Sequence, residues 1–334
     1  MRVTDFTLAN GRPPADVKLI QQSTELAPSL AATPHAFTLV EQLERSIKVL
    51  NKTYDTLLKS PPDALQARSL MWTQQVRQSG ALMQYGMHTL NDELRQQVLD
   101  VQDGMLAGLK SAVPVPFEGA SDVGVRASDD FFDKLIDLID LIKNGYLAGY
   151  EHILKAYSEF FDDFNTEVTA KMKDWIKGAN DGKDVEVNAA EIRYALQRII
   201  EKYSHPNPGS VLFPAPGMGS ATREEADKWR LALGLPANCL KQNSDGSFSV
   251  VMDLSPLITM RDSLPSGAGW VTWSTPSFQA WQTGFNAQEE RLKNMLQSYT
   301  QKYSNANSYH DNFNRTLSSH LNQYADMLKA MLNF

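Results

Sequence analysis

The last sixty residues constrain the fold more than any other part of the chain. From Phe285 to the end there is no glycine and no proline. Apolar residues recur there in steps of three and four, the period of one helix face. A continuous helix over 276–334 would reach about 85 Å, far longer than the helices of ordinary globular proteins. Such a long apolar stripe needs a partner helix, and we expect the chain to supply it.

That partner is predicted over residues 128–178, where an apolar stripe with near-heptad spacing runs from Phe132 to Trp175. We expect Ser128 to cap its start and Gly178 to end it. The segment between the two long helices returns the chain, so they are expected to run antiparallel as a central coiled coil. The start of the first helix would then lie beside the end of the second. Gly149, four residues after Gly145, is interpreted as a place where another backbone approaches closely.

The N-terminal third is read as two regions. Residues 1–33 show no sustained period and are interpreted as a mobile leader. Residues 34–112 carry three apolar patterns of helical period with short joins, which predicts an N-terminal helical hairpin or small bundle. Gly80 and Gly86 are interpreted as breaks between its pieces. Residues 111–127, which contain prolines and glycines, are expected to be a linker.

Residues 179–275 have a different character and predict a small mixed α/β module inserted between the long helices. Residues 184–187 alternate like a short strand, and a helical pattern follows over 189–203. Thr222 and Glu225 have capping-box spacing at the start of another helix. Ser244-Asp245-Gly246 is a hairpin signal between two short strands, and 255–264 is a last short helix. The glycine-rich stretch around Trp270 is interpreted as a connection.

Composition excludes several classes of function. The chain has 39 acidic and 32 basic residues, a net charge of −7 and no basic run, so nucleic-acid binding is not expected. No apolar window approaches the ~18 residues of a transmembrane segment, and no cleaved secretory signal is recognisable. The single cysteine, Cys239, excludes an intrachain disulfide and is interpreted as a small buried side chain.

No catalytic motif is present, so we expect no enzyme, no cofactor and no metal site. His310 and His320 share the last helix but lie ten residues apart, too far to bind one metal ion, and are interpreted as surface or partly packed side chains. The stretch 303–314 holds four asparagines, which are poor helix formers. Two interpretations stay open: the asparagines face water on an enforced helix, or they form a docking surface for another chain.

Two blocks of the last long helix carry a resemblance to a known family. They are Phe278-Gln279-Ala280-Trp281-Gln282-Thr283-Gly284-Phe285 and Gln301-Lys302-Tyr303-Ser304-Asn305-Ala306-Asn307-Ser308. The chain from 128 to 334 resembles the needle-tip proteins of type III secretion systems, of the IpaD, SipD and BipD type. The N-terminal third matches them in layout. The resemblance implies a mainly α fold, with the long antiparallel coiled coil, the N-terminal hairpin and the inserted module described above.

The resemblance also implies a function. Such proteins leave the cytoplasm through the type III apparatus by an uncleaved N-terminal signal and act at the needle tip on the bacterial surface. They form a small ring, thought to be a pentamer, that controls secretion and supports the hydrophobic translocators. Their N-terminal hairpin is regarded as a self-chaperone, and some members bind bile salts. The needle subunit would contact the foot of the helix pair, with candidate residues Phe131, Phe132, Leu135, Asp326, Lys329, Met331 and Phe334.

Three other functions compete with the tip role. A coiled-coil sensor could bind an amphipathic small molecule such as a bile salt between the long helices and the hairpin. A soluble secreted effector could be built on the same helix pair. A pore-forming translocator is disfavoured because no apolar segment is long enough to cross a membrane.

Overall fold

The computed structural model describes residues 38–60, 64–111, 131–267 and 269–333. The leader predicted over 1–33, residues 112–127 of the linker predicted over 111–127 and the Ser128 cap lie outside the described residues; Ser111 is the last residue of a helix. The rest is mainly helical with two small antiparallel sheets. In the described part of the chain, no helix is both long and apolar enough to cross a membrane.

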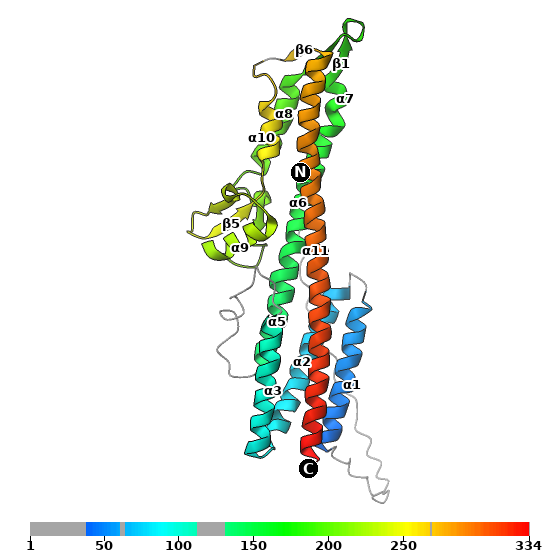
Figure 1. Cartoon of the computed structure of the whole chain (residues 1–334), viewed down its shortest axis with the longest axis vertical. Helices are drawn as coiled ribbons and strands as arrows, with labels where there is room; N and C mark the ends of the chain where they lie inside the picture. Colours follow the sequence, from blue (N-terminus) through cyan, green and yellow to red (C-terminus); the bar gives the residue numbers. More distant parts are fainter. Residues whose placement is uncertain (1–37, 61–63, 112–130, 268, 334) are drawn as a thin grey trace, which may run out of the picture. The chain divides into compact units, whose positions relative to one another are not determined.

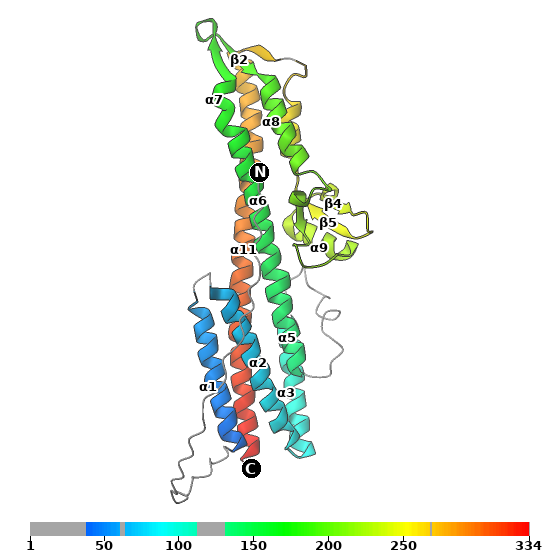
Figure 2. The ribbon, with the colours of Figure 1, turned by 180° about the vertical axis from the view of Figure 1, so that it is seen from behind.

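Two long helical segments lie side by side (Figures 1 and 2). The first consists of α5 (Phe131–Asp140), the π-helical segment η3 (Leu141–Leu147) and α6 (Ala148–Glu167). The second is the single helix α11 (Thr275–Leu332), which is 58 residues long and is capped by Ser274, whose side chain accepts from the Ser277 backbone N–H. Ring contacts with rising numbers on the first segment and falling numbers on α11 confirm the antiparallel direction: Phe131 with Tyr324, Tyr146 with Tyr309, and Tyr157 with Tyr299.

The first long segment ends earlier than predicted. After α6 the chain forms a short 3-10 turn, η4 (Thr169–Lys171), and one further helical turn, α7 (Met172–Trp175). It then becomes strand β1 (Ile176–Ala179), so the prediction that Gly178 ends the helix is wrong. Gly178 lies opposite Val185 in an antiparallel ladder. Glycine is a weak helix former, and the neighbouring strand offers its backbone the hydrogen bonds that a helix would supply.

The described part of the N-terminal region holds three helices, α1 (Leu39–Leu58), α2 (Leu65–His88) and α3 (Asp92–Ser111). Gly80 and Gly86 were predicted to be breaks, but both lie inside α2. A Cβ at Gly80 would lie 2.5 Å from Cδ1 of Phe132, and one at Gly86 would lie 3.1 Å from Cδ2 of Leu328. The two glycines therefore let α2 approach α5 and α11 closely.

The inserted module contains two three-stranded antiparallel sheets with orders β1-β2-β6 and β3-β5-β4. The predicted strand, hairpin and short helices are confirmed, as is the Thr222–Glu225 capping box. The stretch around Trp270 was predicted to be a connection but is strand β6, paired with β2. The further elements are β2 (Asp184–Asn188), α8 (Ala189–Lys202), β3 (Val211–Phe213), α9 (Arg223–Leu233), β4 (Leu240–Gln242), β5 (Phe248–Val251), α10 (Ser255–Asp262), β6 (Trp270–Ser274), and the 3-10 turns η5 (Asn180–Gly182), η6 (Pro208–Ser210) and η7 (Ala237–Cys239).

One hydrophobic core joins the long helices to the helices packed on them. Phe160 and Phe164 on α6 and Tyr299 on α11 are fully buried. Gly149 was predicted to admit another backbone, but its neighbour is the indole of Trp229 on α9. A Cβ at Gly149 would lie 2.8 Å from that ring. The lack of a side chain at Gly149 therefore lets α9 of the inserted module pack closely against the first long segment.

Candidate partner interface at the end of the helix pair

The predicted foot residues of the first segment are core residues. Phe131, Phe132 and Leu135 belong to α5 and are 6%, 5% and 1% exposed. Both phenylalanine rings lie 6.0 Å from the ring of Tyr324 on α11. The structure thus brings the start of one long segment and the end of the other together, as the antiparallel prediction required. It also buries the three apolar side chains.

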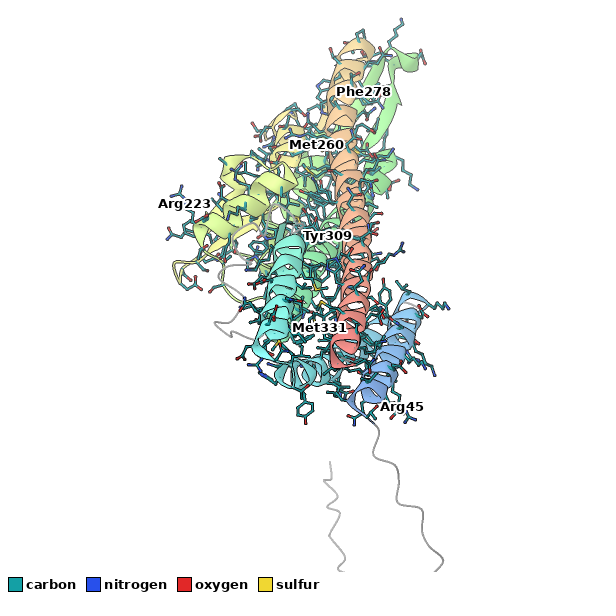
Figure 3. The ribbon with its side chains drawn as sticks, turned by 60° about the horizontal axis from the view of Figure 1, so that its bottom comes forward. Arg45, Arg223, Met260, Phe278, Tyr309 and Met331 are labelled. Carbon is teal, nitrogen blue, oxygen red and sulfur yellow. The ribbon has the colours of Figure 1, made fainter. Side chains whose placement is uncertain are left out.

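The predicted foot residues of α11 are more accessible. Asp326 is largely exposed and forms an ion pair of 2.7 Å with Lys329, one turn further on. Met331 is half-buried close to the end of α11 (Figure 3). Phe334 lies outside the described residues. Of the six predicted residues that the structure describes, Asp326, Lys329 and Met331 are therefore those that a partner could reach in this conformation.

Helices α2 and α3 supply the cover over the aromatic residues. Gly80 of α2 meets the ring of Phe132, as described above. From α3 the side-chain amide of Gln102, which is 5% exposed, donates to the Tyr324 hydroxyl at 2.7 Å. A buried polar bond of this kind adds little net stability but is costly to break on one side. It therefore specifies how α3 is seated on α11.

A second polar contact joins α1 to α11. The side-chain amides of Asn51 and Asn322 exchange two hydrogen bonds, each 2.9 Å long. Both side chains are half-buried. A reciprocal amide pair satisfies one donor and one acceptor on each side, so it favours one register of α1 along α11.

A third polar contact joins α2 to α11 and involves one of the four asparagines. Asn314 is 2% exposed, and its Oδ1 accepts from the Trp72 indole at 3.3 Å. Its Nδ2 lies 3.1 Å from Nε2 of His310, which is 7% exposed. Asn314 thus faces the protein's own α2, which neither interpretation of the asparagine-rich stretch anticipated. The exposed Asn305 instead bonds Gln301 on its own helix at 2.8 Å.

Sequence reasoning overlooked this buried polar cluster, although a signal was present. His310 and Asn314 fall on the same helix face as the apolar residues Ala306 and Leu317, at spacings of three and four. Polar side chains on an otherwise apolar stripe predict a partner for their hydrogen bonds. The sequence alone did not show that Trp72, more than two hundred residues away, is that partner.

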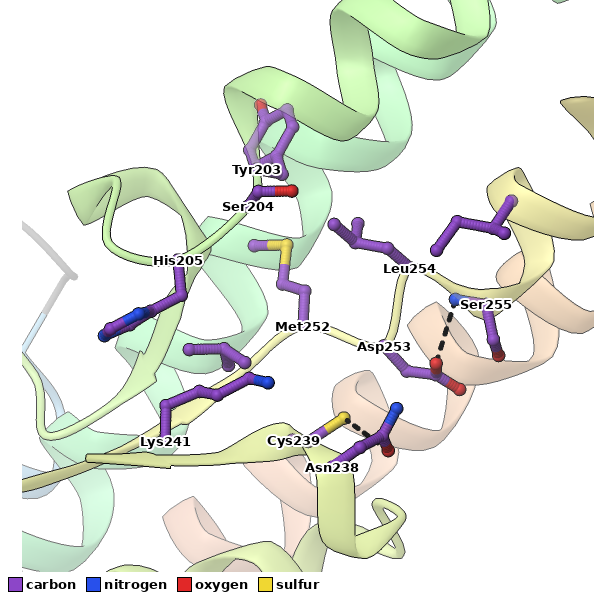
Figure 4. A pocket seen from close by; sticks show the side chains of 12 residues that line it. Tyr203, Ser204, His205, Asn238, Cys239, Lys241, Met252, Asp253, Leu254 and Ser255 are labelled. Carbon is purple, nitrogen blue, oxygen red and sulfur yellow. Dashed lines mark hydrogen bonds between the residues drawn. The ribbon is translucent and has the colours of Figure 1, made fainter. Parts of the chain in front are cut away.

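A separate cavity of about 300 Å³ lies in the inserted module (Figure 4). Cys239 lines it, and burial raises the pKa of its thiol to about 12, so the thiolate needed for nucleophilic attack is suppressed. Asp253 is already engaged, because it accepts from the Ser255 backbone N–H and from Arg291, each at 3.0 Å. Within the described ranges no three His, Cys, Asp or Glu side chains are grouped as metal ligands would be.

Comparison with known proteins identifies the family. A family model for type III secretion systems tip complex components matches residues 22–332. The chain belongs to this family. The family's description is that of a component of a secretion complex and names no enzymatic activity.

The matches to family relatives cover between 61% and 93% of this chain. The cell invasion protein SipD of Salmonella typhi is 31% identical over 321 residues, which covers 93% of this chain and 92% of SipD. The invasin IpaD of Shigella flexneri is 34% identical over 208 residues, 61% of this chain and 60% of IpaD. A crystal structure of the pathogenicity island 1 effector protein of Chromobacterium violaceum aligns with a TM-score of 0.60 at 27% identity, covering 86% of this chain and 94% of the other.

Proposed function

We propose that this chain caps the type III secretion needle as a small ring, a pentamer, and that the ring controls secretion and supports translocator insertion into a host membrane. The observation that carries the proposal is the tip-complex family match over residues 22–332. Relatives bear names that fit it: SipD is a cell invasion protein, and BipD of Burkholderia mallei, 28% identical over 215 residues, is a translocator protein. The partners would be the needle subunit, the hydrophobic translocators and further copies of the chain.

The proposal includes how the helix pair works. The two long segments pack as a coiled coil, and the needle subunit binds at the end that holds Phe131, Asp326 and Lys329. Because Phe131, Phe132 and Leu135 are buried beneath α2, they can reach the needle only after α1–α3 move away. This favours a self-chaperone role for α1–α3, which would cover the aromatic residues before assembly. Residues 1–33 would carry the uncleaved export signal.

The test compares two ion pairs with the same spacing on α11. Asp326 and Lys329 lie at the proposed needle end, whereas Glu290 and Lys293 lie ten turns away, and both acidic side chains are largely exposed. Asp326→Lys and Glu290→Lys therefore reverse comparable surface charges. Needles sheared from cells that express each variant would be labelled with antibody and gold and viewed by electron microscopy.

We expect gold at the distal needle ends for the unchanged protein and for Glu290→Lys. The Asp326→Lys protein should be secreted into the medium but label few needle ends. Equal labelling by the two variants would contradict the needle contact at Asp326. Unlabelled needles for the unchanged protein, with protein in the medium, would contradict the tip role and favour a soluble secreted effector.

Bile-salt binding remains a prediction from the family resemblance. An amphipathic ligand would have to enter between α1–α3 and the long helices, where the described side chains already fill a continuous core. Calorimetric titration with deoxycholate, followed by a thermal-shift measurement, tests it. A heat of binding and a raised Tm would support the ligand-sensor role, and the absence of both would remove it.

A further inference from the structure

A chain of polar contacts leads from α2 to the surface of α11. The Trp72 indole Nε1 lies 3.3 Å from Asn314 Oδ1, and Asn314 Nδ2 lies 3.1 Å from His310 Nε2. On the far side of the ring, His310 Nδ1 lies 3.5 Å from a carboxylate oxygen of Asp311. Trp72, His310 and Asn314 are all under 10% exposed. We call these four residues the Trp72 chain.

The direction of each hydrogen bond in the Trp72 chain is determined by its first member. An indole N–H can only donate, so the atom of Asn314 that faces Trp72 must be the carbonyl oxygen. The Asn314 amide nitrogen then faces His310 and donates to it. The His310 Nε2 must therefore accept, which requires a neutral ring with its proton on Nδ1, the nitrogen near Asp311.

A proton on His310 Nε2 breaks the Trp72 chain in either orientation of the amide. With Asn314 as it stands, an N–H of His310 would face an N–H of Asn314. If the amide turned over, it could accept from His310, but its nitrogen would then face the N–H of Trp72. One pair of donors is left facing each other in both cases. Because Asn314 and Trp72 are 2% and 1% exposed, water has little access to repair the loss.

The groups around His310 shift the pKa of its ring in opposite directions. Burial lowers the pKa of His310, Asp311 raises it, and Lys143 of the π-helical segment η3 lowers it, with a net lowering. From α1, the Tyr54 ring lies 5.1 Å from the Trp72 ring. Burial raises the pKa of the Tyr54 hydroxyl, while Arg315 of α11 lowers it and Asp311 raises it. From α2 the Trp72 indole itself does not titrate. The docked arrangement thus holds the imidazole neutral.

We propose that His310 is a proton-sensitive latch, in which protonation of its ring loosens α2 from α11. The proposal does not depend on the tip role, since it concerns only how α2 is held. It assigns a regulatory function to the buried polar cluster, and it makes mild acid a signal for uncovering the aromatic end of the helix pair.

The pH range over which docking of α2 weakens follows from the linkage between proton binding by His310 and docking. When α2 separates, the His310 ring returns to an ordinary pKa near 6.5, above its lowered value in the docked state. Below about pH 6.5 the separated state binds a proton that the docked state does not. The docking equilibrium constant therefore falls by up to about tenfold per pH unit, until the lowered pKa of the docked state is reached. Above about pH 7.5 this residue contributes no pH dependence.

Thiol labelling can measure rare openings of α2. Val76 is fully buried on α2, one turn from Trp72, and Cys239 is the native cysteine, in the inserted module. The reporter is Val76→Cys with Cys239→Ala in the full chain, labelled with dithiodipyridine between about pH 7.5 and pH 5.5. Dividing the rate by that of the same protein unfolded in urea at the same pH gives the opening constant. The native Cys239, in protein with Val76 unchanged, reports on the inserted module.

Three variants in the reporter background separate the latch from general acid destabilisation. His310→Gln keeps an acceptor for Asn314 but cannot titrate. Trp72→Phe removes the indole donor, which leaves Asn314 free to turn over and accept from a protonated His310. His88→Gln removes an exposed histidine of the same helix, α2, and is the matched control.

The opening constant of the reporter and of His88→Gln should rise severalfold, by up to about tenfold, as the pH falls to about 5.5. His310→Gln should change less than about twofold, and Trp72→Phe should open more at pH 7.5 with a flatter pH profile. Labelling of Cys239 should keep the same opening constant throughout. A flat profile for the reporter, an undiminished rise in His310→Gln, or an equal rise at Cys239 would each overturn the latch.

Discussion

Replacing Gly80 by alanine should destabilise the protein, although alanine is the better helix former. Gly80 lies inside α2 and directly faces Phe132 of α5. A Cβ at this position would lie 2.5 Å from Cδ1, 2.6 Å from Cγ and 3.1 Å from Cβ of that residue. The nearest atoms belong to the base of the ring and not to the end of a flexible side chain. The neighbouring side chain must therefore move as a whole.

Two opposing free-energy terms determine how far Gly80→Ala destabilises the protein. Alanine gains ~1 kcal/mol over glycine in a helix interior. Overpacking a filled core costs ~1–3 kcal/mol. Phe132 has little room to retreat, since its ring lies 5.0 Å from the Phe131 ring and 6.0 Å from the Tyr324 ring. The upper end of the overpacking cost applies, and the net loss of unfolding free energy should be about 2 kcal/mol.

Gly104 on α3 provides the matched control. It is exposed, and a Cβ there would have no heavy atom within 4 Å. Gly104→Ala should therefore gain stability by up to ~1 kcal/mol. Urea unfolding followed by circular dichroism measures both variants. Opposite signs support the reasoning, whereas a gain in stability for Gly80→Ala equal to that for Gly104→Ala would refute the close approach of α2 to α5.

Three further predictions concern single contacts. Asn51→Ala and Asn322→Ala should each lower the unfolding free energy by ~1 kcal/mol. Because the two amides bond each other, the double variant should lose less stability than the sum of the two single losses. Additive losses would mean that the amides do not bond each other. Burial raises the pKa of the Cys239 thiol to about 12. Iodoacetamide at about pH 8 should therefore react at least ~100-fold more slowly with the native protein than with the urea-unfolded protein. Comparable rates would contradict the buried thiol. Arg291→Met leaves the carboxylate of Asp253, 2% exposed, without its guanidinium partner. This should cost ~1–3 kcal/mol in urea unfolding, the penalty for an unsatisfied buried acceptor, whereas Arg291→Lys should retain most of the stability.

The long helices were predictable because one signal extends over many turns. An apolar stripe sustained from Phe285 to Leu328 has no competing interpretation, and its need for cover indicates the first long segment. The strands β1 and β6 were missed because each is short and is defined by its pairing with β2. Gly80 and Gly86 were misread for a related reason. Local propensity marks a glycine as a break, while tertiary packing uses it for close contact.

The candidate interface was predicted in outline only. Antiparallel helices imply that Phe131 lies near the end of α11, and the ring contact with Tyr324 confirms this. Sequence periodicity identified the apolar stripe of α2 but could not show which helix it covers. The burial of Phe132 and Leu135 therefore came from the structure. The same is true of the pairing between Trp72 and Asn314, since it joins positions that no local pattern connects.

The antiparallel register restricts how a chain of this kind can change in length. Tyr157 meets Tyr299 and Tyr146 meets Tyr309, so residue numbers in the two segments add to almost the same total at each contact. Deleting one residue from α6 would turn every side chain beyond it by about 100° and separate these pairs. A deletion in a loop of the inserted module turns none of them. Changes of length in the module are therefore compatible with the pairing of the long helices, whereas the insertion or loss of a single residue within the helices is not.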